Sequence, residues 1–232
     1  MKDKRIEEQY RKWAETYDKD KIRLLEKQGT NYEEFMRRFI DLCDLKQEMN
    51  ILDVGTGTGL TSIAIAKALS CKCKIFAIEP VEEMIGKAKR NIQQEGVEEC
   101  IHIRRGVGES LPCNDENFDL ITCTFAIRHM DVMKAISEFK RVLKRDGKIV
   151  VADICAPEKW RSIPGRIITP FMQFMVSRKY KGEMKSKVLT VEEWKTLLKK
   201  SGLTLDKIIE FPGKREPHWE LKRVIISMRK IG

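Results

Sequence analysis

The segment ILDVGTGTGL combines a carboxylate with three glycines that recur at every second position. Asp53 ends an apolar run, and Gly55, Gly57 and Gly59 follow it. Glycines in such a turn let the backbone approach a ligand closely. A loop that binds nucleoside triphosphates needs a lysine directly after its last glycine, and a dinucleotide-binding loop needs its third glycine at the same place. Leu60 occupies that position, so the sequence argues against a nucleoside triphosphate as the ligand and makes a dinucleotide less favoured.

A second carboxylate adds to the chemistry that the loop suggests. The negative charge of Asp53 would repel a pyrophosphate and suits a ligand with positive charge, such as the ammonium and sulfonium groups of S-adenosylmethionine. Glu79 ends the apolar run KIFAIE, where a carboxylate can accept both hydroxyls of a ribose. Dinucleotide-binding enzymes share this second feature, so only its combination with Asp53 indicates S-adenosylmethionine.

The segments that would hold these side chains alternate between two kinds of pattern. Short apolar runs, typical of buried strands, occur at Asn50–Val54, Lys74–Ile78, Ile101–Ile103, Phe118–Thr124 and Lys148–Asp153. Amphipathic stretches, typical of helices, occur at Thr61–Leu69, Val81–Gln94 and Val132–Leu143. The alternation predicts an α/β fold with a doubly wound, mostly parallel seven-stranded sheet. Because the runs are nearly continuous in apolar residues, we expect helices on both faces of the sheet.

The two ends of the chain extend this core. We expect a helical N-terminal extension and, after the fifth strand, a helical insertion that prolines interrupt. Thr190 and Glu193 have the spacing of a capping box, which predicts a helix that stops at Gly202. Two further strand patterns, Leu205–Phe211 and Leu221–Met228, predict a closing antiparallel hairpin. These patterns divide a single domain, 1–232, into a helical cap (1–45), a cofactor-binding core (46–154), a substrate-side insertion (155–190) and a closing helix and hairpin (191–232).

Five motifs, in order along the chain, resemble those of a known family. DVGTGTG, AIEPVEEMIGKAK, GVGESLP, NFDLITCTFAIRHM and RVLKRDGKIVVAD are similar to the successive motifs of class I S-adenosylmethionine-dependent methyltransferases. Within that group, TFAIRHM and WAETYDKD resemble stretches of the ubiquinone/menaquinone biosynthesis C-methyltransferases, the methyltransferase type 11 group. The resemblance implies a Rossmann-like domain with S-adenosyl-L-methionine as the methyl donor, S-adenosyl-L-homocysteine as the product, and no metal.

The resemblance also implies which residues hold the cofactor. They come from the glycine loop, the ends of three further strands and the N-terminal helix, and they comprise Asp53, Gly55, Thr56, Gly57, Thr58, Gly59, Glu79, Val107, Gly108, Glu109, Thr124 and Tyr17. The loop would meet the methionine moiety, and Glu79 would hold the ribose. At the adenine, the family has an aspartate or asparagine followed by alanine, where this chain has Val107 and Gly108. The Val107 side chain has no acceptor for the adenine amine, so backbone groups or Glu109 would have to provide one.

Two polar residues follow the fourth strand and are candidates for catalysis. Methyl transfer from a sulfonium depends mainly on orientation, but a phenolic or enolic acceptor must also lose a proton. The Arg128 guanidinium would stabilise an oxyanion, and the His129 imidazole would act as general base. Structural roles stay open for both residues, Arg128 as the partner of a carboxylate and His129 as a buried support. Asp153 is a further candidate base, and the lack of prolines after the fourth strand argues against methylation of an exocyclic amine.

Charge and composition leave several partners open. The net charge is +10, and the segment 156–190 is rich in lysine and arginine, which fits nucleic acid, an anionic substrate, an anionic membrane surface or a solvated helix face. We expect methylation of a small molecule, at carbon or oxygen of a phenolic or quinone-like acceptor. The alternatives are methylation of RNA or another macromolecule through this segment, and a non-catalytic module that binds S-adenosylmethionine.

The start of the chain and the cysteines indicate a cytoplasmic protein. The first residues are charged throughout, without the apolar stretch of a secretory signal, and no apolar run is long enough to cross a bilayer. Seven cysteines, an odd count without a CxxC pair, argue against a disulfide framework and against a zinc finger. We expect Cys71 and Cys73 to belong to a strand rather than to a metal site.

Overall fold

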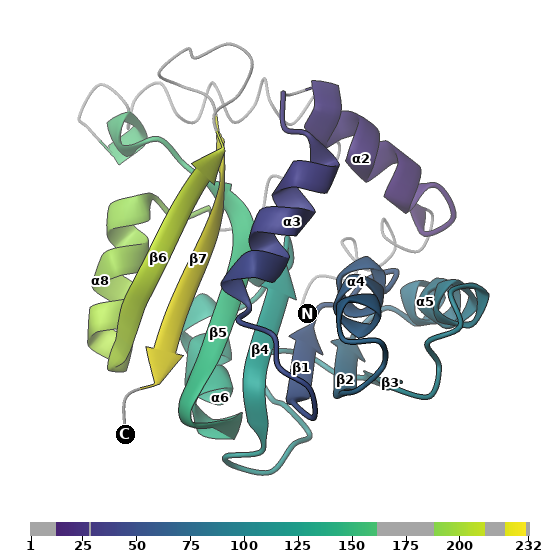
Figure 1. Ribbon diagram of the computed structural model, residues 1–232. Coiled ribbons are helices and arrows are strands. Elements are labelled where there is room, and N and C mark those ends of the chain that lie inside the picture. Colours follow the sequence, from purple (N-terminus) through teal and green to yellow (C-terminus); the bar gives the residue numbers. More distant parts are fainter. Residues whose placement is uncertain (1–12, 28, 162–187, 212–220, 231–232) are drawn as a thin grey trace.

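The computed structural model describes residues 13–27, 29–161, 188–211 and 221–230. They form one seven-stranded sheet in the order β3-β2-β1-β4-β5-β7-β6 (Figure 1). The strands are β1 (Asn50–Val54), β2 (Lys74–Glu79), β3 (Ile101–Arg105), β4 (Phe118–Thr124), β5 (Leu143–Cys155), β6 (Leu203–Phe211) and β7 (Lys222–Lys230). The first five strands run parallel, whereas β7 pairs antiparallel with both β5 and β6. The predicted doubly wound sheet with its antiparallel hairpin is confirmed.

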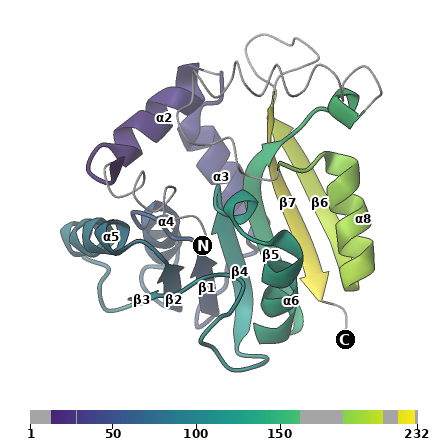
Figure 2. The ribbon, with the colours of Figure 1, turned by 180° about the vertical axis from the view of Figure 1, so that it is seen from behind.

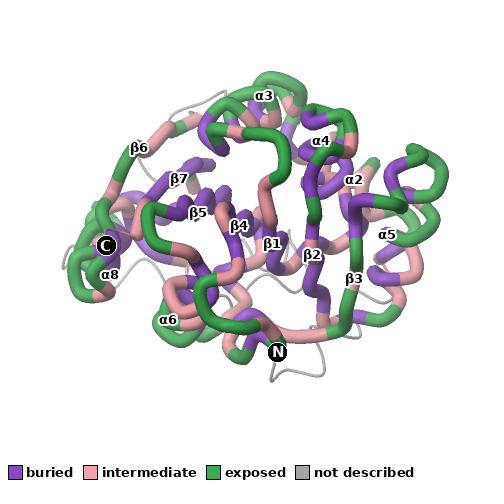
Figure 3. Tube along the Cα trace, turned by 60° about the horizontal axis from the view of Figure 1, so that its bottom comes forward, coloured by how far each residue is buried: buried purple, intermediate pink, exposed green. Residues whose placement is uncertain are grey.

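Helices cover both faces of the sheet. They are α2 (Tyr17–Lys27), α3 (Tyr32–Leu42), α4 (Leu60–Ala68), α5 (Glu82–Gln94), α6 (Val132–Val142) and α8 (Val191–Ser201), with the 3-10 turns η1 (Ile127–His129) and η2 (Glu158–Arg161). Neighbouring strand residues point to opposite faces of the sheet. On the first face, Ile51 belongs to the core under α3, α4 and α5, and on the second face, Leu52 belongs to the core under α6 and α8. Figure 2 shows α6 and α8 in front of the sheet, with α3 and α4 behind it. The strand β1 is buried over most of its length, whereas the edge strand β3 has exposed residues (Figure 3).

The helix α8 begins and ends where its sequence signals predict. The Glu193 amide donates a hydrogen bond to the Thr190 hydroxyl, and the Thr190 amide donates one to the Glu193 carboxylate, which completes the capping box. Gly202 ends the helix in the left-handed conformation, with φ of 66°. The buried side chains of Trp194 and Leu198 then hold α8 against the second face of the sheet.

The helical N-terminal extension is confirmed in the described residues. The helix α3 buries Phe35 and Phe39 against the first face of the sheet, and α2 lies beside it (Figure 1). Of the predicted insertion, residues 155–161, which include η2, and residues 188–190 belong to the described part, and residues 162–187 lie outside it. The division of the chain into four parts stays a prediction. No helix in the described ranges is long and apolar enough to cross a membrane.

One disulfide bond corrects the expectation for the cysteines. It joins Cys71, in the turn after α4, to Cys100, just before β3. These residues are 29 positions apart in sequence, and their Cα atoms lie 5.6 Å apart because the two turns meet at the start of β2 and β3. The remaining cysteines, Cys43, Cys73, Cys113, Cys123 and Cys155, are free. Within the described residues, no three His, Cys, Asp or Glu side chains cluster in a way that would hold a metal ion.

Candidate cofactor and active site

The loops that follow β1, β2, β3 and β4 enclose a pocket at the carboxyl ends of these strands. Open parallel sheets bind ligands at this edge. Predicted site residues that line the pocket are Tyr17, Gly55, Gly57, Glu79, Val107, Gly108, Glu109, Thr124 and His129. The other predicted residues, Asp53, Thr56, Thr58, Gly59 and Arg128, lie outside the lining. The structure therefore separates residues that can touch a ligand from residues that support them.

Gly55 turns the chain sharply at the end of β1. Its φ is +71°, a conformation that favours glycine, and a Cβ at this position would lie 2.4 Å from the Cβ of Ala126. The Gly55 amide donates to the Ile78 carbonyl at 2.8 Å, which ties the loop to β2. A larger residue would push the glycine loop away from the segment after β4, so the first glycine keeps two walls of the pocket together.

Asp53 lies beneath the glycine loop. Its carboxylate accepts hydrogen bonds from the hydroxyls of Thr56 at 2.8 Å, Ser62 at 2.7 Å and Thr122 at 2.9 Å. Burial raises the pKa of Asp53 above its ordinary value, and the hydroxyls partly oppose the shift. Asp53 and Thr56 connect the loop to α4 and β4 through these bonds, and Asp53 does not line the pocket. Its expected contact with the methionine moiety stays a prediction. Ser62 and Thr122 were not predicted, because their pairing with Asp53 is tertiary.

The second half of the glycine loop contacts the N-terminal helix. The Thr58 hydroxyl donates to the Asp18 carboxylate of α2, and the Asn91 amide of α5 donates to the Thr58 carbonyl at 2.9 Å. Gly59 precedes α4 with φ of +88°. Thr58 and Gly59 therefore hold α2, α4 and α5 together at the rim of the pocket. Asp18, which the sequence analysis did not single out, follows Tyr17 in the motif WAETYDKD, and this motif was the available signal.

Glu79 lines the pocket and is only 6% exposed. One carboxylate oxygen accepts a hydrogen bond from the Gly57 amide and the other from the Val81 amide, each at 3.0 Å. Burial raises the pKa of Glu79 to about 7, while the two amides act in the opposite direction. A carboxylate has about four acceptor sites, so about two remain for the hydroxyls of a ribose. The position expected from the sequence is thus matched by an oriented acceptor at the end of β2.

The loop between β3 and β4 forms a further wall of the pocket through Val107, Gly108 and Glu109. A Cβ on Gly108 would lie 2.6 Å from the Met130 sulfur, so this wall packs closely against the segment after β4. The Asp131 amide donates to the Glu109 carboxylate at 3.1 Å, which directs this side chain towards the start of α6. The wall is mostly apolar, as a surface that packs against an adenine ring would be.

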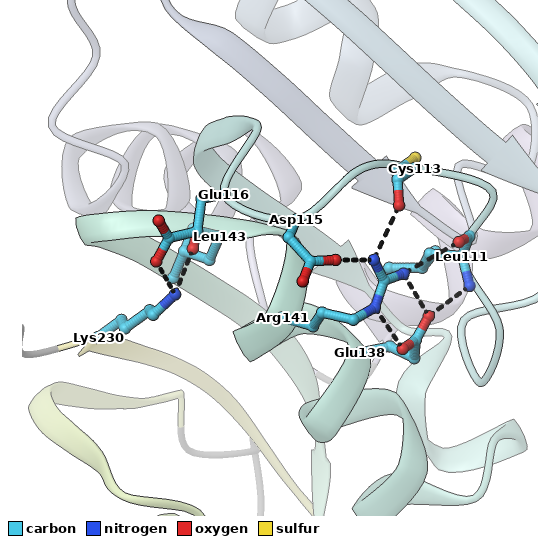
Figure 4. A network of polar contacts seen from close by, with 8 residues as sticks. All are labelled: Leu111, Cys113, Asp115, Glu116, Glu138, Arg141, Leu143 and Lys230. Atoms are coloured by element: carbon cyan, nitrogen blue, oxygen red, sulfur yellow. Dashed lines mark hydrogen bonds and ion pairs between the residues drawn. The ribbon is translucent and has the colours of Figure 1, made fainter.

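Arg141 of α6 holds this loop in place (Figure 4). Its guanidinium donates to the carbonyls of Leu111 and Cys113 at 3.1 and 2.9 Å. It also pairs with Glu138 at 2.8 Å and Asp115 at 2.6 Å, and these carboxylates raise the pKa of Arg141. One side chain of α6 therefore anchors the part of the loop that follows the pocket wall at 107–109.

The chain bends directly after β4, at Phe125. This residue has φ of +55°, an uncommon value for a non-glycine residue, and its amide donates to the Ala152 carbonyl at 2.6 Å. Thr124 lines the pocket, and its hydroxyl accepts a hydrogen bond from the Thr61 hydroxyl at 3.2 Å. The remaining lining residues were not predicted from the sequence; they are Ile78, Pro80, Val81, Met84, Gly106, Phe125, Ala126 and Met130. Most of them are apolar or small, and such residues carry no local signal that separates a pocket wall from a core.

Arg128 forms a buried ion pair. Its Nη1 lies 2.6 Å from Asp153 Oδ1 and donates to the Phe125 carbonyl at 2.7 Å, and both charged side chains are 3% exposed. The Arg128 amide donates to the same carboxylate at 3.2 Å. This geometry favours the structural alternative for Arg128, and it argues against Asp153 as a base because the guanidinium holds its carboxylate. The pair fixes the Phe125 bend to the end of β5.

His129 lines the pocket, but its pKa does not suit a general base. Burial, together with the charges of Arg128 and Lys21, lowers the pKa of His129 to about 3. The imidazole is therefore neutral at physiological pH and a weak proton acceptor. A phenol has a pKa of about 10, so proton transfer from it to this ring would be strongly unfavourable. The neutral ring retains the ability to donate or accept a hydrogen bond.

Comparison with known proteins identifies the core of the chain. Residues 52–151 match the family model described as a methyltransferase domain. Over 120 residues, 51% of this chain and 46% of the relative, the chain is 37% identical to the uncharacterized methyltransferase YcgJ of Bacillus subtilis (strain 168). Over 123 residues, 52% of each chain, it is 33% identical to the ubiquinone/menaquinone biosynthesis C-methyltransferase UbiE of Citrifermentans bemidjiense. The chain thus spans about half the length of these curated relatives.

The fold also has counterparts among solved structures. The crystal structure of the YcgJ protein from Bacillus subtilis matches with a TM-score of 0.71 at 22% identity, over 87% of this chain and 100% of that one. At this identity the likeness shows the fold, and the sequence matches concern the core. The match over residues 52–151 shows a methyltransferase domain in this part of the chain, and the sheet order agrees with the fold likeness.

Proposed function

We propose that this protein is an S-adenosylmethionine-dependent methyltransferase that methylates a small molecule, at carbon or oxygen of a phenolic or quinone-like acceptor. The observation that carries the proposal is the pocket at the carboxyl ends of the parallel strands. It brings the Glu79 carboxylate, the glycine loop and the apolar wall at 107–109 together around one space. The name of the relative UbiE supports a quinone-like acceptor.

The residues of the pocket divide the work of binding. When bound, S-adenosylmethionine supplies a methyl group activated by its sulfonium. Glu79 would accept the ribose hydroxyls, the backbone around Gly55 and Gly57 would meet the methionine moiety, and Val107 would pack against the adenine. Tyr17, from α2, packs with the apolar residues beside the pocket and would exclude water. Since in-line methyl transfer depends on orientation and desolvation, a mostly apolar pocket is suited to it.

The state of His129 and Asp153 supports an acceptor that loses its proton to solvent rather than to a protein base. His129 is a weak base, and the Asp153 carboxylate is held by Arg128. A phenolic or hydroquinone acceptor ionises without a protein base in a small fraction at neutral pH, because its pKa is about 10. Its ring carbon and its oxygen are then both nucleophilic, which agrees with C- or O-methylation.

The two alternatives to this function stay predictions. The basic segment 156–190, on which RNA or anionic membrane binding would depend, lies mostly outside the described residues. Binding of RNA through several phosphate contacts would fall steeply with rising salt. A non-catalytic module would bind S-adenosylmethionine and transfer no methyl group to any component of a cell extract.

The experiment that tests the proposal has two stages. Calorimetry first measures binding of S-adenosylmethionine and S-adenosylhomocysteine to the wild type and to Glu79→Ala, which we expect to bind more weakly. The protein is then incubated with methyl-labelled S-adenosylmethionine and a cell extract, which is separated into small molecules, RNA and protein. Label in the small-molecule fraction supports the proposal. Label confined to RNA or protein, or no label at all, would refute it.

A further inference from the structure

The helix α2 places a lysine beside the pocket. Lys21 is half-buried one turn after Tyr17, and its Nζ lies 4.4 Å from the centre of the Phe125 ring and 5.8 Å from that of Tyr17. Both rings belong to residues that line the pocket. A cation within this distance of an aromatic ring is attracted by it, so the two rings help to position the ammonium. Lys21 therefore lies outside the lining itself, next to the end of the pocket that the segment after β4 forms.

The contacts of α2 fix the position of this lysine. Asp18, one turn before Lys21, accepts the hydrogen bond from Thr58 in the glycine loop. In the turn just before α2, Glu15 pairs with Arg90 of α5. These contacts connect α2 to the loop and to the helix that frame the pocket. The approach of Lys21 to Phe125 thus follows from how the helix docks.

Two cations act on His129 at this end of the pocket. After burial, which has the largest effect, the charges of Arg128 and Lys21 both lower the pKa of His129. A cation that disfavours an imidazolium beside it favours an oxyanion at the same place for the same reason. The Glu79 carboxylate lies two strands away from this end of the pocket, at the end of β2.

We propose that Lys21, together with Phe125 and the neutral ring of His129, forms an oxyanion-binding subsite at this end of the pocket. The inference rests on the proposed function, because it requires the cofactor pocket. Two groups can bring an oxyanion there: the α-carboxylate of the cofactor, and an acceptor ionised at a phenolic or enolic oxygen. In the second case the proton has passed to water before transfer. The bond from acceptor to methyl then forms as the bond from sulfur to methyl breaks, and neutral S-adenosylhomocysteine sulfur remains.

The first arm of the test compares two nucleosides that differ in their carboxylate. S-adenosylhomocysteine has the amino-acid group, and 5′-methylthioadenosine lacks it. Lys21→Met removes the charge at similar length, Lys21→Arg keeps the charge, and Lys19→Met is the matched control because Lys19 is exposed on the same helix. If the cofactor carboxylate binds the subsite, Lys21→Met weakens S-adenosylhomocysteine binding about 10- to 100-fold in calorimetry, while 5′-methylthioadenosine changes less than about twofold. Lys21→Arg and Lys19→Met should remain close to the wild type.

The second arm adds 4-nitrophenol to the protein loaded with S-adenosylhomocysteine and follows the absorbance of the phenolate. If the acceptor oxyanion binds the subsite, the bound phenol has a pKa lowered by about one unit, Lys21→Met restores the solution value, and Lys21→Arg keeps the shift. If Lys21→Met binds both nucleosides normally and gives the same affinities and the same phenol pKa as the Lys19→Met control, the proposed subsite is refuted and the proposed function is not. A wild type that binds neither nucleoside refutes the proposed function, and the subsite with it.

Discussion

Replacement of Glu79 by glutamine removes one charge at the end of β2 and retains the shape of the side chain. Burial raises the pKa of Glu79 from 4.5 to about 7, so ionisation in the empty pocket costs about 3 kcal/mol more than in water. The hydroxyls of a ribose would offset this cost, since a hydrogen bond to a charged group contributes about 1.5–3 kcal/mol. Glutamine offers one acceptor oxygen and no charge. We therefore expect Glu79→Gln to weaken S-adenosylhomocysteine binding about 10- to 100-fold.

The pH dependence of this affinity gives the more specific result. Because the ribose hydroxyls donate to the ionised form, binding favours loss of the Glu79 proton. Above pH 7 that proton is already absent from the empty pocket, and below pH 7 its release opposes binding. The dissociation constant of the wild type should rise by up to about tenfold per unit as the pH falls from about 7 to about 5.5. His129, with a pKa of about 3, does not titrate in this interval.

Calorimetry with S-adenosylhomocysteine from about pH 5.5 to about pH 8.5 measures the effect in the wild type, in Glu79→Gln and in the control Glu82→Gln, whose side chain is exposed on α5. The dissociation constant of Glu79→Gln should not depend on pH. In the empty wild type, the folded state binds the Glu79 proton more tightly than the unfolded chain. The free energy of unfolding should therefore decrease between pH 4.5 and about 7, and Glu79→Gln should lack this decrease. A wild-type dissociation constant that is constant with pH, or an equal slope in Glu79→Gln, would refute the reasoning.

Three further predictions concern the residues around the pocket. Arg128→Ala leaves Asp153 buried without its cation, so we expect the free energy of unfolding in urea to fall by about 3–5 kcal/mol. Normal stability with loss of turnover alone would instead support a catalytic guanidinium. Gly55→Ala places a Cβ 2.4 Å from the Cβ of Ala126, at a φ of +71°. We expect this variant to have a lower melting temperature and a lower affinity for S-adenosylhomocysteine. An unchanged affinity in calorimetry would contradict the close packing. Replacement of both Cys71 and Cys100 by serine should reduce the free energy of unfolding by about 2–4 kcal/mol. The affinity for S-adenosylhomocysteine should not change, because the disulfide lies at the amino ends of the strands and the pocket at their carboxyl ends. If thiol labelling of the unfolded wild type is the same before and after reduction, there is no such bond.

Local sequence patterns were sufficient to predict the helices and strands and part of the pocket lining. Strand β1 and helix α8 begin and end as predicted, because burial on both faces leaves a continuous apolar run and a capping box satisfies backbone groups within one turn. Gly55 and Glu79 were identifiable because a left-handed turn requires glycine and a carboxylate at a strand end faces the ligand edge. These features depend on residues that are close in sequence.

Long-range contacts decided the roles of the remaining polar residues. The sequence by itself determined that Asp53, Arg128 and His129 lie near the carboxyl edge of a parallel sheet and that the domain suits S-adenosylmethionine. Only the tertiary structure showed that Asp53 is surrounded by hydroxyls and that Arg128 is paired with Asp153, 25 residues away. The same holds for the pKa of His129, which depends on burial and on the charge of Lys21 from a distant helix. A side chain's partner and its desolvation depend on which segments meet in space, and spacing along the chain does not contain that information.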